Sequence, residues 1–142
     1  MVKISHLFVV NTPSATVFNN LSTIKGLAGW WTADTSGNPE LGGEIRFGFG
    51  KDYNIMKVTA SKKDRLIAWD CKYSSFALGI EWIGTKLSFA LSEDKDKKTL
   101  VKFEQNDWKG YTDFYATCNY HWRQFMTSLK MLCETGKGKP NN

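Results

Sequence analysis

Hydrophobic and polar residues alternate with a period of two along several stretches of the chain. In residues 84–91, Lys86 and Ser88 occupy one face, and the other face carries Thr85, Leu87, Phe89 and Leu91. Such alternation is typical of a strand with one buried face. The same pattern, with turn residues between the runs, predicts further strands at 2–10, 43–50, 53–61, 66–73 and 99–107. Because the connections are short, we expect neighbouring strands to be antiparallel.

Apolar residues recur at helical spacing near the end of the chain. Between 112 and 134 they follow steps of three and four, at Phe114, Cys118, Trp122, Phe125, Leu129 and Leu132. This spacing predicts one long amphipathic helix. Gly136 is a natural helix stop, and residues 136–142, rich in Gly, Lys, Pro and Asn, are predicted to form a flexible tail.

The remaining segments are shorter. Two short helices are predicted at 14–23 and 23–32, after the turn and capping residues that end the first strand. Residues 34–43 have the Asp, Ser, Gly, Asn and Pro content of a loop. Residues 74–82 are compatible with a further strand or with a bulged lead-in to the next one.

The order of these elements predicts an α+β fold. A curved antiparallel sheet of about six strands has one face to bury, and the long C-terminal helix can cover its concave side. At 142 residues the chain is expected to form one domain, residues 1–135, followed by the tail. Because a cylinder does not fill a curved trough, we expect a cavity between helix and sheet.

Composition favours an apolar pocket and argues against several other partners. Aromatic residues make up 14% of the chain, enough for a thick core or a pocket lining. The net charge of +5 arises mostly from lysines in turns and in the tail, so nucleic acid is not expected as a partner. No apolar run approaches 18 residues and none resembles a signal peptide, so we expect a cytoplasmic protein without membrane insertion.

Five motifs occur in the order seen in one superfamily. They are SATVFNNLSTIKGLAGWWT, PELGGEIRF, GTKLSFAL, TLVKFEQNDW and HWRQFMTSLKMLCETGKG. Over about residues 8–139 the chain resembles the SRPBCC (START-like, helix-grip) superfamily, and within it the activator of heat-shock-protein ATPase homologue-like family. Trp30, Trp31 and Trp122 match that family's pattern. The turn 39–43 has one residue more than the pattern, and His121 stands where the helix usually carries glycine.

The resemblance implies a helix-grip fold but leaves the function open, because the superfamily includes lipid and polyketide binders, cyclases, other enzymes and cochaperone domains. The first hypothesis is binding of a small hydrophobic or aromatic molecule in the cavity. The second is a cyclase or hydrolase that uses the same cavity. The third is a module that regulates a chaperone ATPase, which would make a chaperone its partner.

The candidate site consists of residues expected to face the cavity. One of the adjacent Trp30 and Trp31 is expected in the core and the other at the cavity mouth. The predicted ligand-binding set is Trp31, Phe47, Met56, Trp69, Phe89, Phe103, Gln105, Cys118, His121, Trp122 and Phe125.

Few residues offer chemistry beyond binding. His121 is the catalytic candidate, as an acid or base. Cys118, three residues earlier on the same helix, could pair with it as a nucleophile. Asp70 and Glu81 are expected to face solvent. The three cysteines form no CxxC motif, and neither a metal nor a cofactor is expected.

Overall fold

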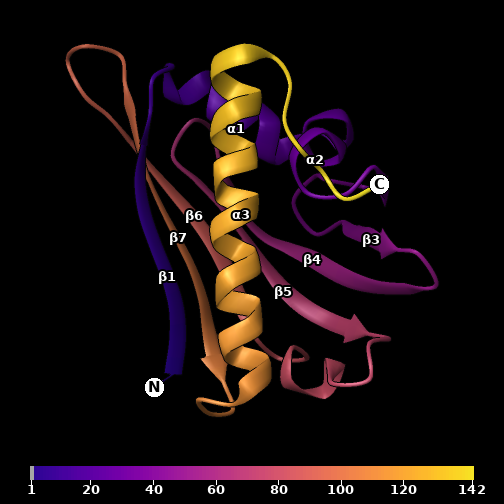
Figure 1. The fold of residues 1–142 in the computed structure, drawn as a ribbon. Helices are drawn as coiled ribbons and strands as arrows, with labels where there is room; N and C mark the ends of the chain where they lie inside the picture. The colour runs from indigo at the N-terminus through magenta and orange to yellow at the C-terminus, as the bar shows by residue number, and fades with distance from the viewer. Residues whose placement is uncertain (1) are drawn as a thin grey trace.

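The computed structural model describes residues 2–142 and shows one antiparallel sheet with a long helix lying across it (Figure 1). The sheet has seven strands in the order β1-β7-β6-β5-β4-β3-β2. Their bounds are β1 (Val2–Val10), β2 (Asp34–Gly37), β3 (Glu44–Phe49), β4 (Asp52–Lys62), β5 (Leu66–Ser74), β6 (Lys86–Glu93) and β7 (Thr99–Trp108). From β2 to β7 each strand pairs with the next along the chain, as the short connections predict.

The long helix α3 (Asp113–Thr135) forms where the apolar spacing predicts it. The Thr112 hydroxyl accepts a hydrogen bond from the Tyr115 amide at 3.1 Å and caps its start. Gly136 ends it in the left-handed conformation, with φ of 84°. Its buried face consists of Cys118, Trp122, Met126, Ser128, Leu129 and Cys133.

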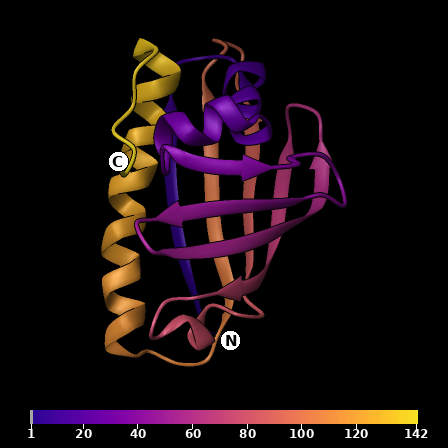
Figure 2. The same ribbon diagram turned by 90° about the vertical axis from the view of Figure 1, so that its right-hand side faces the viewer.

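Two short helices follow β1: α1 (Ser14–Ser22) and α2 (Ile24–Trp30). Thr23 begins α2 by accepting a hydrogen bond from the Gly26 amide at 3.0 Å. The two helices cross closely at Gly26, where a Cβ atom would lie 2.5 Å from the Asn20 Cα. Figure 2 shows both helices at one end of the sheet, beside the C-terminal end of α3.

The core lies between the sheet and these helices. In β6, Leu87, Phe89 and Leu91 are buried, as alternation predicts. On the outer face Lys86 pairs with Asp70 at 3.1 Å. The helix-grip fold is therefore confirmed, including the short helices after the first strand and the long helix at the end of the chain.

Two segments differ from the sequence-based prediction. Residues expected to form a loop contain β2, an exposed edge strand that pairs with β3. Polar residues suffice there because pairing uses backbone groups and the side chains stay exposed. Residues 75–85 form a loop around the 3₁₀ turn η1 (Gly79–Glu81), which is neither a further strand nor a bulged lead-in to β6. Trp82, which follows this turn, is buried.

The C-terminal segment lies against the second helix and the start of β2. The Asn141 amide donates to the Trp31 carbonyl at 2.9 Å, and the Ala33 amide donates to the Asn141 carbonyl at 2.8 Å. The Lys139 amide donates to the Ser128 hydroxyl at 2.8 Å. These bonds hold the segment in one position in the structure; its flexibility stays a prediction.

Candidate functional site

A pocket of about 390 Å³ lies between α3, the loop 75–85 and three neighbouring strands. The strands contribute the end of β3, the start of β4 and the end of β5. Its aromatic lining consists of Trp31, Phe49, Phe76, Trp82, Phe114, Trp122 and Phe125. Its other lining residues are Asn54, Ser74, Thr117, Cys118, His121, Gln124 and Asn141. None of the fourteen is an aspartate, glutamate, lysine or arginine. The volume falls within the range of small-molecule sites.

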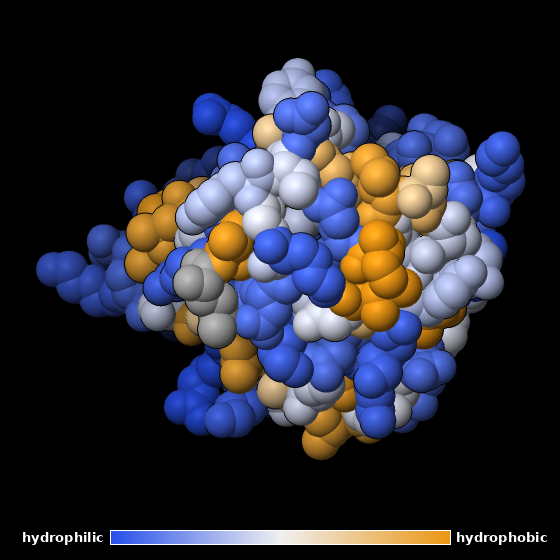
Figure 3. Space-filling view, turned by 90° about the horizontal axis from the view of Figure 1, so that it is seen from below, coloured by the Kyte–Doolittle hydropathy of each residue, from blue (hydrophilic) through white to orange (hydrophobic). Residues whose placement is uncertain are grey.

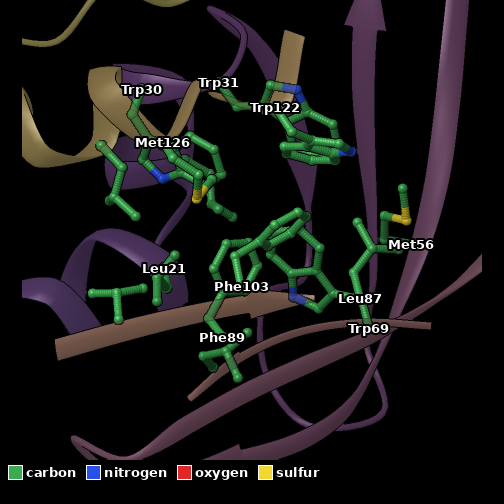
Figure 4. Packing of buried hydrophobic residues seen from close by; sticks show 14 of the residues in the cluster. Leu21, Trp30, Trp31, Met56, Trp69, Leu87, Phe89, Phe103, Trp122 and Met126 are labelled. Atoms are coloured by element: carbon green, nitrogen blue, oxygen red, sulfur yellow. The ribbon is translucent and has the colours of Figure 1, made fainter. Parts of the chain in front are cut away.

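Three tryptophans form the inner wall of this pocket. The rings of Trp82 and Trp122 stack with centroids 5.9 Å apart and an interplanar angle of 12°. Trp31 contacts both, with centroids 6.4 Å from Trp82 and 4.9 Å from Trp122. Figure 4 shows Trp31 beside Trp122, with Phe103, Trp69 and Phe89 below them in the view. These large flat surfaces suit an aromatic or alicyclic ligand.

The pocket lies on one side of α3 because the other side is held against β1 by hydrogen bonds. Along that side the Tyr115 hydroxyl donates to the Lys3 carbonyl at 2.7 Å, and Asn119 bonds to His6 at 2.9 Å. Farther along the helix, the Glu134 carboxylate accepts from the Asn11 amide at 2.7 Å. These bonds fix the helix against the β1 edge and leave its opposite side apart from β4 and β5.

The predicted site residues divide into two groups. The first group lines the pocket: Trp31, Cys118, His121, Trp122 and Phe125. The second lies in the core and does not line it: Phe47, Met56, Trp69, Phe89, Phe103 and Gln105. The second group supports the wall, because Phe47 and Trp69 pack on Trp31, and Phe103 packs on Trp122. Of the tryptophan pair, Trp30 lies in the core, and Trp31 is buried in the inner wall of the pocket rather than at its mouth, where one of the two was expected.

Gln105 holds the inner wall in place rather than lining the pocket. Its side-chain carbonyl accepts from the Trp122 indole N–H at 2.8 Å. Its amide nitrogen donates to the Thr85 hydroxyl at 3.0 Å, and Thr85 donates in turn to the Trp82 carbonyl at 2.7 Å. All of these groups are buried, so the network fixes the orientation of the Trp122 ring.

Sequence reasoning missed several lining residues, and three of them carry a usable signal. Phe114 begins the apolar row of α3 that continues to Cys118 and Trp122. Asn54 lies two residues before Met56 in the buried row of β4, so the alternation continues to it. Phe49 likewise continues the row of Phe47 in β3. Phe76 and Trp82 come from the loop 75–85, and Asn141 from the C-terminal segment; no periodic pattern places them.

The pocket offers little chemistry beyond binding. Burial raises the pKa of the Cys118 thiol to about 11, although the Trp82 indole N–H, 3.3 Å from the sulfur, partly opposes this effect. The thiol is therefore protonated at neutral pH and is a weak nucleophile. His121 is exposed at the mouth, and its side chain is the remaining acid–base group of the lining.

The groups outside the lining do not supply a catalytic partner. Asp70 pairs with Lys86 on the outer face, and Glu81 accepts a hydrogen bond from the Thr112 hydroxyl near the start of α3. Within residues 2–142 no group of three or more His, Cys, Asp or Glu side chains could hold a metal ion. None of the helices in the same range is both long and apolar enough to cross a membrane.

Apolar side chains are exposed at the end of the molecule where α3 begins. Leu78 and Ile80, in the loop that also carries Phe76 and Trp82, are 50% and 69% exposed. Figure 3 looks onto this end and shows apolar residues in orange among polar residues in blue.

Comparison with solved structures shows what the chain is similar to. The Aha1 dimer from Colwellia psychrerythraea, solved in solution, is 33% identical, covers 97% of this chain and 100% of its own, and has a TM-score of 0.84. Protein SSP2350 from Staphylococcus saprophyticus is 19% identical over 98% of this chain and 97% of its own, with a TM-score of 0.76.

A third solved structure shares the fold alone. DynU16, described as a putative protein in the dynemicin biosynthetic locus, is 18% identical over 96% of this chain and 48% of its own, with a TM-score of 0.75. No family model matches the chain, and no curated protein does so either. The identity to the Colwellia protein over nearly the full length of both chains confirms the predicted resemblance. This chain belongs to the Aha1-like family of SRPBCC proteins.

Proposed function

We propose that this protein binds a small hydrophobic or aromatic molecule in the pocket beside α3. The observation that carries the proposal is the pocket itself, about 390 Å³ in volume and lined by seven aromatic side chains. A ligand placed there would lie against Trp31, Trp82 and Trp122. Burial of its apolar surface supplies the driving force, and loss of its free motion opposes it.

The test uses N-phenyl-1-naphthylamine, a neutral dye whose emission rises in apolar surroundings. The expected result is a saturable rise in emission with a Kd on the order of micromolar. Thr117→Trp, a change at an exposed position of the lining, should place a large ring in the mouth and weaken binding by about tenfold or more.

Ala116→Trp is the matched control, because Ala116 is the neighbouring exposed position and does not belong to the lining. It should bind the dye as the parent protein does. If the dye does not bind the parent, or if both variants bind it equally well, the pocket is not the binding site.

A second function is favoured by the comparison with the Colwellia protein. That protein is named as an Aha1, and it aligns with this chain over nearly its whole length. A chaperone ATPase is therefore the second proposed partner. The test is the rate of ATP hydrolysis by a purified heat-shock-protein ATPase as this protein is added. An unchanged rate, together with no retention of the chaperone on the immobilised protein, would exclude this function.

A further inference from the structure

The pocket contains a polar group that binding of a purely apolar molecule does not explain. Asn54 in β4 is 3% exposed, and its side-chain oxygen has no hydrogen-bond partner among residues 2–142. Four buried polar side-chain atoms share this property in the described chain: those of Thr12, Asn54, Trp69 and Trp108. Asn54 is the member of this set that lines the pocket.

Asn54 occupies a position in β4 where its neighbours in the same row are apolar. The inward row of β4 continues from Asn54 to Met56 and Val58, which are both buried apolar residues. Across the ladder Asn54 pairs with Ser74 of β5, a buried residue that also lines the pocket. Two polar side chains therefore lie side by side on adjacent strands in a lining that is otherwise largely aromatic.

An unpaired amide oxygen at this depth destabilises the folded protein, whereas a leucine of similar shape would not. The oxygen itself has almost no accessible surface, so a ligand that donates a hydrogen bond reaches it after rotation of the amide by 180°, which exchanges the positions of oxygen and nitrogen. Without that rotation Asn54 can present its amide nitrogen to an acceptor. The side chain thus fits either a hydroxyl or a carbonyl group.

The charge of the lining restricts the ligand further. None of the fourteen lining residues is an aspartate, glutamate, lysine or arginine, and His121 lies at the exposed mouth. A charged group carried to the depth of Asn54 would lose its hydration without gaining an ionic partner. The group that reaches Asn54 must therefore be neutral.

We propose that Asn54 selects ligands with a neutral hydroxyl, carbonyl or amide group at the end that enters the pocket. The aromatic or alicyclic body of such a ligand lies against the wall formed by Trp31, Trp82 and Trp122. This inference rests on the proposed binding function and names the ligand class of the same site. Asn54 is then its specificity-determining residue.

The test compares three probes with the same two-ring body: naphthalene, 2-naphthol and 2-naphthoate. Their binding is followed at neutral pH by chemical-shift changes of the ¹⁵N-labelled protein. The parent should bind 2-naphthol about fivefold to tenfold more tightly than naphthalene, the value of one hydrogen bond. Because 2-naphthol is the less hydrophobic of the two, apolar burial cannot produce this preference. The anion 2-naphthoate should bind most weakly.

Asn54→Leu should abolish the preference for 2-naphthol and keep the affinity for naphthalene. Asn19→Leu, the same change at an exposed position on α1, should keep both. The variant Asn54→Leu should also unfold at a higher temperature than the parent, because the change removes an unpaired buried amide. Its thermal unfolding transition confirms that it is folded.

The outcomes separate the two proposals. If the parent binds 2-naphthol no better than naphthalene, or if Asn54→Leu retains the preference, the role of Asn54 is wrong and the pocket remains a binding site. If none of the three probes binds up to its solubility limit, the binding function fails and the role of Asn54 fails with it.

Discussion

Individual side chains fix the inner wall of the pocket, which is formed by Trp31, Trp82 and Trp122. Gln105 holds the Trp122 indole N–H at 2.8 Å, and Cys118 accepts from the Trp82 indole N–H at 3.3 Å. Two of the three wall tryptophans thus have their polar atoms satisfied inside the protein. Their flat faces remain for apolar contact, which is the division expected of amphipathic rings.

Because the Cys118 thiol is buried, the free energy of unfolding is expected to fall at high pH. Burial raises the pKa of Cys118 from 9.0 to about 11. In the unfolded chain the thiol ionises as the pH passes 9, whereas in the folded protein it stays protonated until about pH 11. Its contribution to stability is therefore complete below pH 9 and is lost as the pH rises from 9 to 11.

This dependence is testable with Cys118→Ala. Between pH 8 and 10.5 the free energy of unfolding, measured by urea denaturation, should fall by about 2 kcal/mol less in the variant than in the parent. Lysines and tyrosines that titrate in the same range are present in both proteins, so their effect on the free energy of unfolding cancels in the comparison. An equal fall in both proteins would contradict the raised pKa.

At the scale of elements, the regular periods were predictable from the sequence and the irregular segments were not. β6 and α3 form where their apolar spacing predicts them, because each buries one face. Burial of one face repeats apolar residues at every second position of a strand and at every third or fourth position of a helix. β2 lacks such a pattern because it is an exposed edge strand held by backbone bonds. The loop 75–85 has none either, although it supplies Phe76 and Trp82 to the pocket.

The same reasoning explains why the candidate site was predicted only in part. Residues such as Phe47 and Phe89 do face the inside of the sheet, as alternation predicts, but helices and other aromatic rings cover them. Which inward residues line a pocket depends on where α3 lies over the sheet. Hydrogen bonds from α3 to β1 and to Asn11 just beyond it help to fix that position, and they join residues more than 100 positions apart.

The end of α3 depends on one glycine. Gly136 adopts φ of 84°, and no atom lies within 4 Å of the position that a Cβ would occupy. Gly136→Ala should therefore destabilise the protein through backbone strain alone, by about 1 kcal/mol in urea denaturation. Gly110→Ala is the matched control, because Gly110 has equally open surroundings without a left-handed φ. A loss of the same size in the control would refute the role of backbone strain.

Over the whole molecule, the pocket joins segments from both ends of the chain. Trp31 follows α2, Trp122 lies within α3, and Asn141 lies in the segment beyond α3. The backbone of Asn141 pairs with Trp31 and Ala33, so the C-terminal segment and the pocket wall are bonded directly. A ligand that contacts Trp31 and Asn141 should therefore hold this segment in place, whatever its mobility in the free protein.

Amide hydrogen exchange measures this coupling. If release of the segment also disrupts the ligand site, a ligand present at 100 times its Kd should slow exchange of the Asn141 and Ala33 amides by about 100-fold. N-phenyl-1-naphthylamine is a suitable ligand. The Leu91 amide, which donates to the Arg65 carbonyl at 2.8 Å and lies outside the lining, reports on other openings of the protein. Exchange that slows equally at all three amides would indicate general stabilisation, and unchanged exchange at Asn141 would show that the segment moves independently of the pocket.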